Sequence, residues 1–193
     1  MKVAFVSNSN GNLALLETAL AMLVERHEVD RIVPVGGAIA DVEAALAARR
    51  RRFPEEVAWT DPGYEDYVVA AVLEGVVETP PAELDRTELI EMTIRPLAPQ
   101  ETAIDIAGRR VGVAFEGEPL PDAPVIVSAS PGLHGVDRFQ GRIRVCPGQL
   151  RDLVWDEEPA SCALVAMAEG QLYVGFLDLY GDLLEEAVSI EPG

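Results

Sequence analysis

Short apolar runs and amphipathic segments alternate along the first third of the chain. Residues 3–6 form a continuous apolar run, a second run follows over 32–35, and leucines recur at helical spacing between them, from Leu13 towards His27. Continuous runs of this length are typical of strands covered on both faces in a mainly parallel sheet. The pattern therefore predicts a β-α-β unit, followed by a second helix over 41–52 with Asp41 as its N-cap.

Strand patterns dominate the rest of the chain. Residues 64–76 fit a helix, whereas apolar runs predict strands over 57–59, 102–106, 111–115, 125–127, 163–167, 172–177 and 184–190. We expect residues 3–6 to be central in one sheet with 32–35 and 125–127 beside them. The three strands of the tail would then close a second sheet. This alternation predicts an α/β fold, and 193 residues suit a single domain over 1–193.

The charge balance narrows the choice of partners. Thirty-three acidic residues stand against fifteen basic ones, which gives a net charge of -18. Such a chain repels phosphate backbones and anionic membrane surfaces, so we expect no nucleic-acid partner and no membrane partner. No apolar run reaches the length of a membrane span and no signal sequence precedes the first strand, so we predict a soluble, cytoplasmic protein. Cys146 and Cys162 have no metal-type spacing, and we expect both thiols to be free and reduced.

The polar turn over 7–12, Ser-Asn-Ser-Asn-Gly-Asn, is the first candidate site. It follows a predicted strand and precedes a predicted helix, for which Asn12 is placed as the N-cap. In open α/β folds, ligands bind beyond the carboxyl ends of the strands, where helix N-termini present their N–H groups.

This turn resembles the opening motif Ser-Asp-x-His-Gly-Asn of the calcineurin-like metallophosphoesterases, specifically the small prokaryotic phosphodiesterase branch. The resemblance continues over nearly the whole chain, with the family's Gly-Asp, His-Gly, Gly-His-x-His and Asn-Pro-Gly-Ser motifs falling on 36–37, 116–117, 129–132 and 146–149. It implies a four-layer αββα sandwich, in which two mixed sheets face each other with helices outside them.

The resemblance also implies that the chemistry has changed. Family members hold two divalent metal ions with Asp, Asn and His side chains. The corresponding positions here are Asn8, Asn10, Gly37, Thr60, Glu116, Ser130 and Gly132, and we add Asn12 and His134 as further lining residues of the vacated pocket. Only Glu116 is a strong ligand type, and the chain has two histidines in total. We therefore expect no metal cofactor and no catalytic residue.

Three functional hypotheses remain open. The first is a degenerate metallophosphoesterase-fold protein that acts as a binding or scaffold protein. The second is an active phosphoesterase with a rebuilt metal site using Asp61, Glu116 and His134. The third is a metal-free sensor that binds a small anionic ligand at the turn over 8–12 through backbone N–H groups. The resemblance leaves homo-oligomerisation open.

Overall fold

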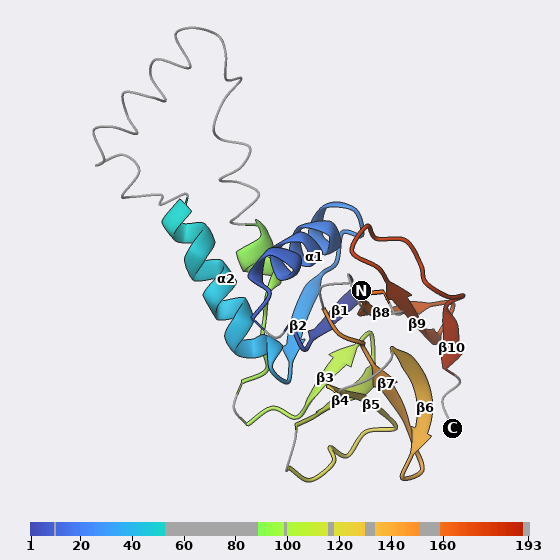
Figure 1. Cartoon of the computed structure of the whole chain (residues 1–193). Coiled ribbons are helices and arrows are strands. Elements are labelled where there is room, and N and C mark those ends of the chain that lie inside the picture. Colours follow the sequence, from blue (N-terminus) through green and yellow to red (C-terminus); the bar gives the residue numbers. More distant parts are fainter. Residues whose placement is uncertain are drawn as a thin grey trace, which may run out of the picture.

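A computed structural model describes residues 1–9, 11–52, 89–98, 100–115, 118–129, 134–150 and 159–190. The predicted strand over 57–59 and the predicted helix over 64–76 lie outside these residues. Within them the chain forms two five-stranded sheets and two long helices (Figure 1).

The first sheet combines the two ends of the chain. Its strand order is β10-β9-β8-β1-β2. The strands are β1 (Lys2–Ser7), β2 (Arg31–Val35), β8 (Cys162–Ala168), β9 (Gln171–Leu177) and β10 (Val188–Ile190). β1 pairs in parallel with β2 and antiparallel with β8, so the sheet is mixed.

The second sheet comes from the middle of the chain. Its strand order is β3-β4-β5-β7-β6. The strands are β3 (Ala103–Ile106), β4 (Arg109–Ala114), β5 (Val125–Ser128), β6 (Gly135–Phe139) and β7 (Arg142–Cys146). β5 is parallel to both of its neighbours, whereas the outer pairs β3-β4 and β6-β7 are antiparallel hairpins.

Side chains of β1 point alternately into two apolar cores. Val3 and Phe5 enter a core between the two sheets, where they join Val111 and Val127 of the second sheet. Ala4 and Val6 enter a core on the other face of the first sheet. All four β1 side chains have no exposed surface, which explains why this strand is a continuous apolar run rather than an alternating one.

The second core lies between the first sheet and the helices α1 (Leu13–Glu25) and α2 (Ala38–Arg52). Both helices lie on the same side of this sheet in Figure 1. On the outer face of the second sheet, Pro121 packs against Gly112, where a side chain at position 112 would collide with it. In the described part of the chain, no helix combines the length and the apolar character needed to cross a bilayer.

The facing mixed sheets confirm the predicted fold class, but two strand placements were wrong. Residues 125–127 lie in the second sheet as β5, and the tail strands extend the first sheet through β8 beside β1. An apolar run predicts burial without selecting the neighbouring strand. Since β5 and β1 contribute to the same core from opposite sides, both assignments satisfy the same hydrophobic pattern.

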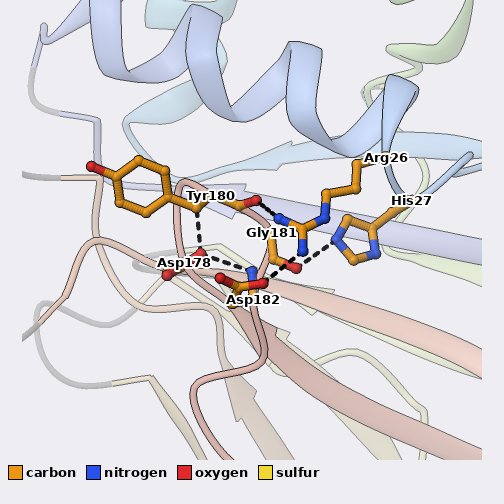
Figure 2. A network of polar contacts seen from close by, with 6 residues as sticks. All are labelled: Arg26, His27, Asp178, Tyr180, Gly181 and Asp182. Carbon is orange, nitrogen blue, oxygen red and sulfur yellow. Dashed lines mark hydrogen bonds and ion pairs between the residues drawn. The ribbon is translucent and has the colours of Figure 1, made fainter.

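A polar network fixes the carboxyl end of α1 to the turn after β9 (Figure 2). Arg26 donates to the carbonyl of Tyr180 and to Asp182 Oδ1, the latter at 2.6 Å. His27 Nε2 donates to the Gly181 carbonyl at 2.9 Å. Asp178 Oδ1 accepts from the N–H groups of Tyr180 and Asp182 and thereby shapes the turn. The network holds α1 in place at the end opposite the candidate site.

Truncating a side chain of β1 tests its role between the sheets. Phe5 has no exposed surface, so Phe5→Ala should lower the free energy of unfolding by about 3–5 kcal/mol through lost burial and a cavity. Tyr180 is 78% exposed, and Tyr180→Ala is the control with an expected change below about 0.5 kcal/mol. Urea unfolding measures both, and equal effects of the two substitutions would contradict the assignment.

Both thiols should be inert in the folded protein. Burial raises the pKa of Cys162 to about 12, and it also raises the pKa of Cys146 against the opposing influence of Arg144. Because the thiolate is the reactive form, neither residue should react with a chromogenic disulfide reagent at pH 8. In denaturant both thiols should react, at two equivalents of reagent per chain. Rapid modification of either residue under native conditions would show that its surroundings admit solvent.

Candidate functional site

Three strand ends converge at one edge of the molecule. Asn8 follows β1, Gly36 follows β2, and Ala129 follows β5. A Cβ at Gly36 would lie 2.5 Å from the Cβ of Ala129 and 3.5 Å from Asn8 Oδ1. The backbone at Gly36 has φ +57°, which favours glycine. The edge that the sequence predicts for a ligand is therefore closely packed around Gly36.

The turn after β1 is shaped by its own backbone and by Asn12. Asn8 has a left-handed conformation with φ +45°, which asparagine tolerates better than most residues. Asn12 N donates to the Ser9 carbonyl at 2.8 Å, and Asn12 Oδ1 accepts from Leu15 N at 3.2 Å. Asn12 is thus the N-cap of α1, as the sequence predicts.

Asp41 holds this turn from the neighbouring helix. Its Oδ2 accepts from Ser9 Oγ at 2.6 Å and from the N–H of Gly11 at 2.8 Å. The prediction that Asp41 caps α2 is wrong, because α2 already begins at Ala38 and Asp41 lies in its first turn. From there the carboxylate still benefits from the helix dipole while it reaches across to the turn after β1.

A second set of buried polar contacts joins β1 to the turn after β7. The hydroxyl of Ser7 donates to the Gly148 carbonyl, and Ser161 Oγ donates to the Pro147 carbonyl at 3.1 Å. Ser7 has no exposed surface and Ser161 is 1% exposed, so both hydroxyls need internal acceptors. Gly148 has φ +89°, and a Cβ there would overlap Ser161 Oγ.

His134 lies beside this second set of contacts. Its ring is tilted against that of Phe176 with centroids 5.0 Å apart, and its Cβ borders Gly148. His134 Nε2 is 3.9 Å from Glu185 Oε1, and 12% of the histidine side chain is exposed. The imidazole therefore packs against β9 and the segment that follows it.

The structure describes four of the nine predicted pocket residues. Asn8, Asn12, Gly37 and His134 all follow or precede the strands at this edge, and Gly37 contributes no side chain. The other five, Asn10, Thr60, Glu116, Ser130 and Gly132, lie outside the described residues. Asp61, proposed for a rebuilt site, lies outside them as well.

Two of the family's seven ligand positions are among the described residues, and neither supplies a carboxylate or an imidazole. At the family's ligand positions they offer the neutral amide of Asn8 and the bare backbone of Gly37. Asp41 is the carboxylate beside them, and its Oδ2 already accepts two hydrogen bonds. Across the described ranges no three His, Cys, Asp or Glu side chains are grouped to hold a metal ion. Two divalent cations need several carboxylates to offset their charge.

Sequence reasoning missed the residues that close this edge. The role of Asp41 as an acceptor for the turn after β1 could have been considered from the sequence. β1 and β2 were predicted to be parallel neighbours, so a carboxylate in the first turn of the helix after β2 can reach the turn after β1. Gly148 follows a proline in a motif with known spacing, yet only the structure reveals that Ser161 fills the space above it.

Comparison with known proteins defines the fold. No protein-family model matches the chain, and no curated protein matches it significantly in sequence. Among solved structures, a conserved uncharacterised protein from Streptococcus pneumoniae, described as a predicted phosphoesterase, is similar with a TM-score of 0.52 at 11% identity, over 98% of this chain and 97% of that one. The chain shares the fold of this predicted phosphoesterase, in agreement with the architecture that the resemblance to the metallophosphoesterases implies.

A second structure agrees with this metallophosphoesterase-like fold. A hypothetical protein from Pyrococcus horikoshii is similar with a TM-score of 0.51 at 19% identity, over 94% of this chain and 88% of that one. Identities this low establish a shared architecture and leave the chemistry to the residues of each chain. Within the metallophosphoesterase-like fold, the edge described above is where the resemblance locates the metal ligands.

Substitution of Gly148 tests the packing at this edge. Gly148→Ala adds a methyl group that overlaps the Ser161 hydroxyl and also strains the backbone, so we expect a loss of at least about 3 kcal/mol of unfolding free energy. Gly170→Ala is the matched control, because Gly170 has φ +79° with no heavy atom within 4 Å of the added Cβ. It should cost only the backbone strain, about 1–2 kcal/mol.

A double substitution separates overlap from strain. Ser161→Gly in the Gly148→Ala background removes the overlapping hydroxyl. In thermal or urea unfolding, the double variant should therefore lose less unfolding free energy than the sum of the losses of the two single variants. If the two losses of unfolding free energy were additive, or if Gly148→Ala and Gly170→Ala lost equal amounts, the overlap with Ser161 would not be the cause of the destabilisation.

Proposed function

We propose that this protein is a non-catalytic member of the metallophosphoesterase-like fold, which acts by binding rather than by metal-dependent hydrolysis of phosphoesters. The turn after β1 carries this proposal. Asn8 stands where the resemblance requires a metal-binding Asp, and the adjacent Ser9 and Gly11 are tied to Asp41. Gly37 stands where a bridging Asp would be. Metal-dependent hydrolysis of a phosphodiester needs carboxylates that hold the divalent ions, and Asn8 and Gly37 supply none.

The rebuilt-site phosphoesterase has less support. Of its three proposed ligands, His134 is the one described, and its imidazole packs on Phe176 with Glu185 at 3.9 Å. It borders Gly148 rather than the convergence of Asn8, Gly36 and Ala129.

The metal-free anion sensor is also less well supported. This hypothesis needs free N–H groups in the turn and at the start of α1. The N–H groups of Gly11, Asn12, Leu13, Leu15 and Leu16 all donate to acceptors within the protein. An external anion that binds any of these five N–H groups would have to displace its acceptor.

Elemental analysis and an activity assay test the proposed function together. Protein purified without chelator should contain less than stoichiometric manganese, iron, zinc or nickel. It should not hydrolyse bis(p-nitrophenyl) phosphate above the buffer rate when each of these metals is added. Bound metal together with turnover that Glu116→Ala or His134→Ala abolishes would establish the rebuilt-site enzyme instead.

Restoring one ligand should not restore activity. Asn8→Asp returns a carboxylate to the first motif but leaves Gly37 without one, so the charge of two divalent ions stays largely unbalanced. We expect no gain in metal content or turnover from Asn8→Asp, with Asn12→Asp as a control for added charge in the same turn. A gain specific to Asn8→Asp would mean that the site is one residue from function.

A further inference from the structure

The turn after β9 and the residue that follows it expose two apolar side chains. Tyr180 is 78% exposed and Leu183 is 56% exposed. Figure 2 shows the Tyr180 ring directed away from the side chains of Arg26 and His27. Tyrosine is among the residue types that dominate the binding energy of protein interfaces, because it offers a large apolar area on a side chain with few rotatable bonds.

The backbone that presents Tyr180 is fixed before any partner binds. Asp178 Oδ1 accepts from the Tyr180 N–H at 2.8 Å, and Arg26 donates to the Tyr180 carbonyl. Gly181 packs so closely on the carboxyl end of α1 that an added Cβ would lie 2.8 Å from His27 Nε2. A fixed backbone lowers the entropic cost of association, so the exposed ring is preorganised for a contact.

Leu183 extends the apolar surface onto the helix-bearing face of the first sheet. A Cβ added at Gly175 of β9 would lie 2.8 Å from Leu183 Cδ2, so the leucine covers this glycine. Gly175 pairs with Leu164 of β8, which is partly buried and packs against the core beneath the helices. The exposed part of Leu183 therefore continues that apolar core to the surface of the molecule.

The charges beside these side chains select the chemistry of a partner. The segment 178–186 contains four carboxylates and no basic residue. Asp182 is paired with Arg26 at 2.6 Å and Glu185 lies 3.9 Å from His134, whereas Glu186 is exposed. An acidic border around an apolar surface attracts lysine and arginine and repels phosphate groups. In a two-fold dimer this surface would meet itself, so like charges would face each other.

We propose that Tyr180 and Leu183 form a docking surface for a partner protein, which binds through a peptide segment whose apolar side chains are flanked by lysine or arginine. The docking surface lies beside the carboxyl end of α1, whereas the candidate site lies at its amino end. It therefore goes beyond the proposed function. Metal content or phosphodiester turnover would overturn the proposed function while peptide binding at Tyr180 would stand, so the two failures are distinguishable.

A pool of short synthetic peptides tests the docking surface. Each peptide has the form Lys-Lys-x-x-Lys-Lys, in which both x positions are Leu, Phe or Trp. Added to the isotope-labelled full chain at constant ionic strength, this pool should shift the amide resonances of Tyr180 and Leu183 in a saturable way. A matched pool with Ser at both x positions carries the same charge and should leave these two resonances in place.

Substitutions on the protein locate the binding energy. Tyr180→Ala and Leu183→Ala should each weaken binding of the apolar pool by at least about tenfold. Glu186→Gln should weaken it by about two- to threefold, because one carboxylate of the acidic border is lost. Met92→Ala is the matched control, since Met92 is 60% exposed on the segment before β3, and it should bind as the wild type does. If Leu183→Ala unfolds because Gly175 is uncovered, Tyr180→Ala decides.

Three results would overturn the docking surface. The first is the absence of a saturable shift at Tyr180 and Leu183, and the second is equal affinity of the wild type and Tyr180→Ala for the apolar pool. Equal shifts with the serine pool would show that charge alone attracts the peptides. In sedimentation, a concentration-dependent dimer that Tyr180→Ala dissociates would assign this surface to a second copy of the chain instead.

Discussion

Burial of β1 on both faces is the constraint on which the rest of the molecule depends. Phe5 and its neighbours Val3 and Val6 have no exposed surface, although they belong to two different cores. One strand therefore packs against the second sheet on one face and against the helices on the other. Because β1 is packed closely on both faces, its position is fixed, and so is the start of the turn that follows Ser7.

Around that turn, polar groups are satisfied by the protein itself. Ser7 donates to Gly148, Ser9 donates to Asp41, and Ser161 donates to Pro147. Each of these hydroxyls is buried and each finds an acceptor on another segment. This edge of the molecule is thus held together by hydrogen bonds between its own side chains and backbone. Identities this low to similar folds establish the architecture alone.

The sequence predicted buried elements well and their partners less well. β1, α1 and β2 follow from continuous apolar runs and leucine spacing, and Asn12 caps α1 as expected. β5 was assigned to the wrong sheet because its pattern encodes burial on two faces, which either sheet provides. The hairpin of β6 and β7 was missed, although the Gln140-Gly141 turn between apolar-alternating segments signals it. The role of Asp41 depends on a contact between residues 30 positions apart, which no local pattern specifies.

The close contact between Gly36 and Ala129 bears on how this chain could be redesigned. The family motif has glycine where this chain has Ala129, and the methyl group of Ala129 occupies the space directly above the Gly36 backbone. A side chain introduced at position 36 must first be given room, so Ala129→Gly would have to precede that substitution. Position 37 differs, because no heavy atom of the described residues lies within 4 Å of a Cβ added there, so a carboxylate at 37 needs no such preparation.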